Sequence, residues 1–344
     1  DHAADVASVG LHELEVGVGL EAPQGAGGAV VAAAGGGEDD LLVARHVDRV
    51  EAMHPHGPRA VPPFADAAAA AGAADSYLVE LNHAIANWGK AIYIRPMGEM
   101  NNAGTFYSGF KENGQSKGAD HAPAQFRKAF ARIYVILHGG TIEAVNAKLA
   151  RLGLPAVQGN EVFENPFPQL RIIWSPLAAD NPRIPANAAK EYFPGAAYVD
   201  VMGGDIYDEQ LTDTAPWAGL EKLAKAATAQ GKPFSVPEAG LSSVDDPAFV
   251  LHMCRFLASH PRTETHVYYE SKPGSPWDLG SKPKSLVAYR ACMTPRAGEL
   301  PAWAAANAPG GGADVVALKL TPRPASGGSP LAVTFSITAK LTVP

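Results

Sequence analysis

The sequence predicts an α/β fold, a (β/α)8 TIM barrel, followed by a short β-rich C-terminal segment. Two observations lead to this prediction. From about residue 90 to 293, short β-rich runs alternate with longer helical patterns, which is typical of parallel strands joined by helices. The strands add up to about eight, which fits one barrel of ordinary size. A doubly wound sheet is the alternative, but residues 25–37 lack the glycine spacing that usually follows its first strand.

The elements before residue 90 are the least distinct. Residues 59–64 indicate a strand and residues 66–87 a helix, whereas residues 10–37 are rich in glycine and ambiguous. We infer up to three strands in this part. Five strand–helix units follow. Their strands are expected at residues 91–95, 171–174, 197–202, 232–236 and 265–269, and their helices include residues 123–137, 217–229, 247–259 and 284–292.

The composition changes after Trp303, and we divide the chain there. Residues 1–303 are the expected barrel, residues 304–313 a linker rich in Gly, Ala and Pro, and residues 314–344 a β-strand segment. The stretch 324–335 resembles the opening of a PKD-like or immunoglobulin-like sandwich module, which would make this end a truncated module. A hairpin packed on the barrel is the alternative.

Composition excludes several classes of protein. The 344 residues include 28 Lys and Arg against 35 Asp and Glu, a formal net charge of −7, so we expect no nucleic-acid partner. No run of about 18 apolar residues is free of charges, Gly and Pro, so we expect no membrane span. Because the chain begins at Asp1 without an apolar leader, we expect a processed product or a fragment.

Metal and disulfide chemistry have weak signals. The run His54-Pro55-His56 precedes an expected strand, and His56 is a candidate for lining the cleft, but two histidines alone do not make a metal site. We therefore expect no metal and no cofactor. Cys254 and Cys292 are too few for a disulfide framework, although a single disulfide between them is possible.

Two glutamates follow strands at the expected C-terminal face of the barrel, where active sites of this fold lie. Glu99 follows the strand 91–95, and Glu238 follows the strand 232–236. If the run 265–269 is the eighth strand, these two strands are the fourth and the seventh. Cleavage of a glycosidic bond needs one carboxylic acid to protonate the leaving oxygen and one carboxylate to attack or to activate water. The pair therefore predicts a glycosidase.

Four motifs in order resemble glycoside hydrolase family 26 and its relatives in the large clan of retaining barrels. Ile94-Arg95-Pro96-Met97-Gly98-Glu99-Met100-Asn101-Asn102 resembles the acid/base segment, and Lys232-Pro233-Phe234-Ser235-Val236-Pro237-Glu238-Ala239-Gly240 resembles the nucleophile strand. Ile173-Trp174-Ser175-Pro176 is similar to the fifth strand, and Val199 to Tyr207 is similar to the sixth. The similarity spans roughly residues 90 to 293.

The resemblance implies roles for three residues. Glu99 would be the general acid/base, Glu238 the nucleophile, and Tyr207 the residue that orients Glu238. Gly98 stands where the family often has His. Either Asn101 or Asn102 then supplies the missing polar contact, or the chain belongs to a divergent subfamily with altered substrate preference.

A sugar substrate also needs polar contacts and aromatic platforms. Arg95 is expected to point inward, and Asp205 is a candidate ligand of a sugar hydroxyl. The candidate aromatic contacts lie in loops or at strand ends: Tyr107, Trp174, Tyr269 and Trp277.

Together these features predict a secreted, monomeric, retaining β-glycanase. The expected partner is a polysaccharide or oligosaccharide, first of all β-mannan, with mixed-linkage β-glucan or xylan as the alternative. A barrel that binds glycan without cleaving it is a second hypothesis. A third is a metal-dependent enzyme that uses Glu99, Asp205 and Glu238 as ligands.

Overall fold

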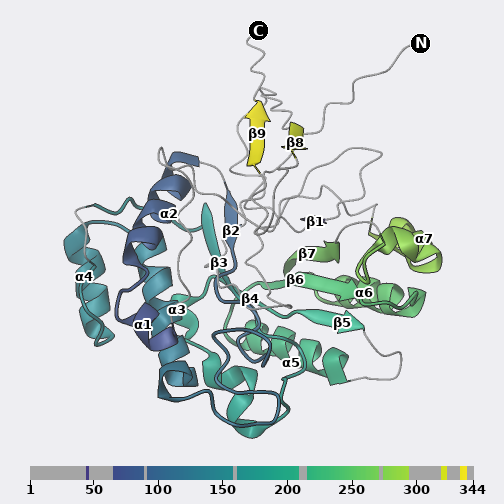
Figure 1. Ribbon diagram of the computed structural model, residues 1–344, viewed down its shortest axis with the longest axis horizontal. Helices are drawn as coiled ribbons and strands as arrows, with labels where there is room; N and C mark the ends of the chain where they lie inside the picture. The colour runs from purple at the N-terminus through teal and green to yellow at the C-terminus, as the bar shows by residue number, and fades with distance from the viewer. Residues whose placement is uncertain are drawn as a thin grey trace.

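A computed structural model describes residues 44–45, 65–88, 91–157, 161–208, 215–270 and 274–293, and the two strands 319–323 and 334–338. In Figure 1, α2 and α4 lie on the left of the picture and α6 and α7 on the right, with the strands between them. The chain is an α/β protein with parallel strands in its main sheet.

The described strands of the main sheet are joined in the order β1-β7-β6-β4-β3-β2, and β5 pairs with β6. The strands are β1 Ala44–Arg45, β2 Ile92–Ile94, β3 Leu170–Trp174, β4 Val201–Gly203, β5 Ile206–Asp208, β6 Phe234–Leu241 and β7 Thr263–Glu270. Sequence order is kept from β7 to β2, and the first strand lies beside the last, with Ala44 opposite Tyr269. This is the strand order of the predicted (β/α)8 barrel. The predicted strand at residues 59–64 lies outside the described residues.

Helices connect most of these strands, as parallel pairing requires. They are α1 Asp66–Ala70, α2 Asp75–Trp88, α3 Pro123–His138, α4 Ile142–Arg151, α5 Ala215–Ala229, α6 Pro247–Ser259 and α7 Pro283–Cys292. Short 3-10 turns occupy Ala119–His121, Pro185–Asn187, Ala189–Tyr192, Ala196–Tyr198 and Leu279–Ser281. Four of the α-helices, α3, α5, α6 and α7, carry Pro in their first turn, where a missing N–H costs no hydrogen bond.

The structure corrects three predicted boundaries. The helix expected at 66–87 is two helices, because Gly72 takes a left-handed φ of 98° between them. The strand expected at 197–202 begins only at Val201, because Ala196–Tyr198 form a 3-10 turn and the Asp200 carboxylate, in place of a backbone carbonyl, accepts a hydrogen bond from the Ile172 amide at 2.8 Å. The strand expected at 232–236 runs on to Leu241, so Glu238 lies inside β6 and not after it.

A disulfide between Cys254 and Cys292 joins α6 to α7, with 6.2 Å between the two Cα atoms. The pairing that the sequence leaves open is therefore made. At the C-terminus, β8 Lys319–Arg323 and β9 Thr334–Thr338 form a separate antiparallel pair, which agrees with the predicted β-rich segment. The sandwich module stays a prediction. Of the helices in the described part of the chain, none has the length and apolar character needed to cross a bilayer.

Candidate active site

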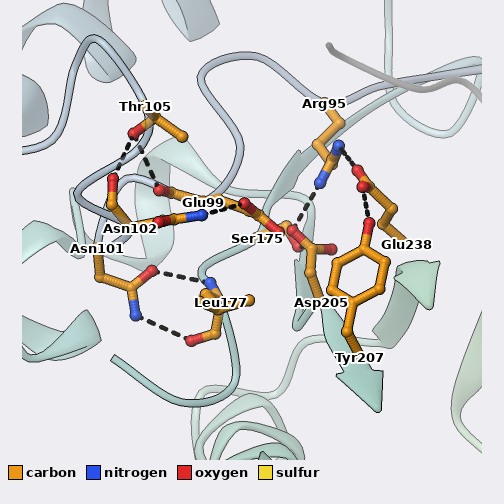
Figure 2. Close-up of polar contacts among 10 residues, drawn as sticks. All are labelled: Arg95, Glu99, Asn101, Asn102, Thr105, Ser175, Leu177, Asp205, Tyr207 and Glu238. Atoms are coloured by element: carbon orange, nitrogen blue, oxygen red, sulfur yellow. Dashed lines mark hydrogen bonds and ion pairs between the residues drawn. The ribbon is translucent and has the colours of Figure 1, made fainter. Parts of the chain in front are cut away.

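Polar side chains from five neighbouring segments meet at the C-terminal ends of the parallel strands (Figure 2). Arg95 comes directly after β2, Ser175 directly after β3, and Asp205 between β4 and β5. Tyr207 lies in β5 and Glu238 in β6. Parallel strands bring these ends to one edge, so residues more than a hundred positions apart become neighbours.

Arg95 is the centre of this group. Its Nη1 donates to Asp205 Oδ2 at 2.6 Å, and its Nη2 makes an ion pair with Glu238 Oε2. The Ser175 hydroxyl donates to the other oxygen of Asp205 at 2.8 Å. The side chains of Arg95 and Asp205 are fully buried, which makes each contact stronger than it would be in water.

Glu238 has a second partner in Tyr207, whose hydroxyl donates to Glu238 Oε1. The Tyr207 ring belongs to an aromatic trio with Tyr269 and Trp277. The Trp277 ring meets Tyr207 edge-on at 4.9 Å and Tyr269 edge-on at 5.3 Å between centroids. The three rings are each partly exposed, so this trio forms a rim beside the Glu238 carboxylate.

The charges of the group act on one another. Burial raises the pKa of Asp205 well above its usual range, Arg95 opposes this shift, and Glu238 and Glu99 add to it. Burial alone would lower the pKa of Arg95, but Asp205 and Glu238 raise it, so the guanidinium keeps its charge. Both glutamates are thus close enough to influence one buried aspartate.

Glu99 lies in a tight turn after β2. Met97 and Glu99 have left-handed φ values of 51° and 54°, which are uncommon for residues with a side chain and often mark functional sites. The Glu99 amide donates to the Ser175 carbonyl at 2.8 Å, and the Thr105 hydroxyl donates to the Glu99 carbonyl at 3.2 Å. These contacts anchor the turn to β3 and to the following loop.

The two asparagines after Glu99 have different partners (Figure 2). Asn102 Nδ2 donates to Glu99 Oε2 at 2.8 Å. Asn101 exchanges two hydrogen bonds with the backbone of Leu177, both at 2.8 Å, and donates to Asp180 at 2.7 Å. The structure therefore brings Asn102 to the carboxyl and uses Asn101 to fix the adjoining loop.

The remaining predicted site residues are dispersed. Tyr107 is buried beside Phe126 and lies within electrostatic reach of Glu99, Glu238 and Arg95, although burial is the main cause of its raised pKa. Trp174 is only 2% exposed and packs edge-on against Phe193 at 5.1 Å, so its ring has no open face for a sugar. This position contradicts the expectation of a platform at Trp174. His56 lies outside the described residues.

Two features of the site could not be predicted from the sequence. Ser175 stands inside a recognised motif, yet its role as the partner of Asp205 depends on a neighbouring strand. Gly98 packs against the Arg95 guanidinium, and this contact forms only in the folded turn. Within the described ranges, no three His, Cys, Asp or Glu side chains are grouped to hold a metal, and the guanidinium of Arg95 lies between Asp205 and Glu238.

Comparisons with known proteins give structural neighbours only. No family model and no curated protein matches the chain. A GH26 β-mannanase from Bacteroides ovatus is 16% identical with a TM-score of 0.41, covering 69% of this chain and 63% of that one. A β-mannanase from a symbiotic protist of the termite Reticulitermes speratus is 18% identical with a TM-score of 0.39, covering 67% and 56%.

A GH26A protein from a Muricauda species is 23% identical with a TM-score of 0.35, and the match covers 62% of this chain and 54% of that one. The chain therefore spans between about half and two thirds of the length of these three neighbours.

Proposed function

We propose that the protein is a retaining glycoside hydrolase that cleaves a β-linked polysaccharide, with Glu238 as nucleophile and Glu99 as general acid/base. One observation supports the proposal above all others. Two carboxyl groups project from the same end of the sheet into different environments, and one of them, that of Glu238, is bound by the guanidinium of Arg95 and the hydroxyl of Tyr207. Different environments for two carboxyls are what acid and nucleophile roles require.

The environment of Glu238 suits a nucleophile. The Arg95 guanidinium makes an ion pair with one carboxylate oxygen, and the Tyr207 hydroxyl donates a hydrogen bond to the other. They use one oxygen each, so the carboxylate is held in a fixed orientation for attack on the anomeric carbon. Glu238 is 6% exposed, which leaves it shielded from bulk water but within reach of a bound sugar.

The environment of Glu99 suits an acid that must also become a base. Its carboxyl oxygen accepts a hydrogen bond from the neutral amide of Asn102, which can donate to the carboxyl group in either protonation state. In the first step Glu99 protonates the leaving oxygen while a Glu238 oxygen forms an ester with the sugar and the glycosidic bond breaks. In the second step Glu99 removes a proton from water, which displaces Glu238 and restores both groups.

The aromatic trio supports a sugar substrate. Sugar rings present apolar C–H faces, and Trp277 and Tyr269 form a partly exposed rim next to the nucleophile. We propose β-mannan as the substrate on the family 26 resemblance of the motifs, with mixed-linkage β-glucan or xylan as the alternative. Secretion and a monomeric state belong to the same proposal.

A reducing-sugar assay over a panel of β-mannan, mixed-linkage β-glucan and xylan tests the function. The purified chain should release new reducing ends from at least one of these polymers. Glu238→Ala and Glu99→Ala should each lower turnover by roughly a thousandfold or more. Glu112→Ala is a matched control, because this exposed glutamate lies on the loop that follows Glu99. Near wild-type hydrolysis by either site variant would refute the residue roles, and glycan binding without new reducing ends would favour the non-catalytic hypothesis.

A further inference from the structure

Gly98 lies buried between Met97 and Glu99, and the backbone does not explain why this residue is glycine. Its two neighbours adopt left-handed φ angles, whereas Gly98 itself does not. An L-residue could therefore adopt the backbone conformation of position 98 without the usual cost of a positive φ. The reason for glycine has to be space.

That space is filled by Arg95. A Cβ atom on residue 98 would lie 2.9 Å from Cζ and Nη1 of Arg95 and 3.1 Å from its Nε. Carbon atoms make favourable contact only at about 3.5 Å and beyond, so one side would have to move. The end of an arginine is usually free to move. Here it is fully buried and tied to Asp205 and to Glu238 at the same time.

The other partner of Glu238 also packs against a glycine, but less tightly. A Cβ atom on Gly240 would lie 3.2 and 3.3 Å from the Tyr207 ring and 3.5 Å from Trp277. A shift of a few tenths of an ångström would relieve that contact. The arrangement at Gly98 therefore has much less tolerance for added atoms than the arrangement at Gly240.

We propose that Gly98 is a positioning residue: the missing side chain seats the Arg95 guanidinium where it holds Glu238 and Asp205. This inference rests on the proposed function, because it assigns Gly98 an effect on the nucleophile of that reaction. A methyl group at position 98 displaces the guanidinium and so disturbs the orientation of Glu238. Substrate contacts along the aromatic rim are left in place.

Kinetics of Gly98→Ala test this directly. We expect kcat to fall by about tenfold or more while KM stays within about threefold, because the lost contact acts on the reacting carboxylate. Gly240→Ala should show a smaller fall in kcat. Gly204→Ala is the control for crowding alone: its Cβ would lie 2.8 and 2.9 Å from the ends of Leu223 and Leu220, apolar groups away from Glu238. It should lower the melting temperature and leave kcat of the folded protein nearly unchanged.

A double-mutant cycle with Arg95→Lys separates positioning from general damage. Lysine has a single side-chain nitrogen and can move its ammonium group away from residue 98. Gly98→Ala should therefore lower kcat less in the Arg95→Lys background than in the wild type. Additive losses, or wild-type kcat in Gly98→Ala, would overturn the inference while leaving the proposed function standing. If the wild type cleaves no β-glycan, the function fails instead. The same cycle measured on free energies of unfolding then still tests the contact between Gly98 and Arg95.

Discussion

Glu238 and Glu99 project from the same end of the sheet, but the chain holds them in different ways. Glu238 lies within the eight-residue strand β6 and is bound by a cation and a hydroxyl. Glu99 lies in a turn, and its carboxyl contacts Asn102. Lys117, which lies further along the chain, holds the loop after this turn. Its Nζ donates to the carbonyls of Ala103 at 3.0 Å and Thr105 at 2.6 Å.

On the proposed function, this difference corresponds to separate tasks for the two carboxylates. The Glu238 side is built from strands and a buried charge cluster, which suits a group that must keep its charge and direction. The Glu99 side is built from a turn and neutral donors, which suits a group that exchanges a proton twice per cycle. Substitutions that exchange or remove these supports should therefore have unequal effects on the two sides.

The largest effect is expected from Arg95→Met. The change leaves Asp205 and Glu238 buried without their cation, and the free energy of unfolding should fall by about 3–5 kcal/mol. Urea denaturation measures it. The loss should be smaller at pH 5 than at pH 8, because protonation of Asp205 relieves the uncompensated charge. Arg171→Met is the control, since it breaks another mostly buried pair, with Glu264, near the opposite ends of the strands. A loss below about 1 kcal/mol for Arg95→Met would contradict the central role of this cation.

Next comes Tyr207→Phe, which removes one hydroxyl from the Glu238 side and keeps the ring. Hydrogen bonds to charged groups contribute about 1.5–3 kcal/mol, so kcat should fall by roughly 10- to 100-fold with little loss of stability. Steady-state kinetics and a thermal melt distinguish the two quantities. Unchanged kcat would show that Tyr207 packs against the site without orienting the nucleophile.

A smaller effect, confined to the acid side, is expected from Asn102→Ala. We expect kcat/KM to fall by about tenfold for a polysaccharide, whose leaving oxygen needs protonation. A dinitrophenyl glycoside leaves without that help, so its kcat/KM should hardly change. Equal losses on both substrates would mean that Asn102 supports sugar binding and has no selective influence on the acid.

The last prediction concerns the buried Asp66, which lies within electrostatic reach of Lys117. Neither carboxylate oxygen of Asp66 has a hydrogen-bond partner among the described residues, and burial raises its pKa to about 8, with Lys117 opposing the shift. The folded state then binds a proton that the unfolded state lacks between pH 3.8 and about 8. Stability from this group is full below that window and is lost as pH rises through it, by at most about 1.4 kcal/mol per pH unit.

Asp66→Asn should remove this slope. Urea denaturation of both proteins at pH 5 and pH 8 should show that the free energy of unfolding of the variant rises relative to that of the wild type as the pH rises. A constant difference between the two proteins at both pH values would mean that Asp66 titrates normally in the folded state.

The two sides also differ in how well they could be predicted from the sequence. Residues on strands were predictable, because alternating β-rich runs and helices place Arg95, Tyr207 and Glu238 at one edge of a parallel sheet. All five strands expected after residue 90 appear, although β4 begins four residues later and β6 ends five residues later than expected. Local pattern is sufficient where the backbone is regular.

The irregular parts could not be predicted from pattern. The left-handed turn at Met97 and Glu99 is stabilised by contacts with Ser175 and Thr105 that arise only in the folded chain. Trp174 ends a strand as expected, yet Phe193 from a distant turn covers its ring. The packing of Arg95 against Gly98 depends on Asp205 and Glu238, which lie more than a hundred residues away.

The most direct test of the central claim is to trap the sugar on the protein. A 2-fluoro glycoside of the preferred sugar with an activated leaving group forms the glycosyl ester faster than water can remove it. Mass spectrometry of the digested protein should then show one fluoroglycosyl group on the peptide that contains Glu238. An adduct on another residue, or complete turnover with inverted product and no adduct, would contradict the account.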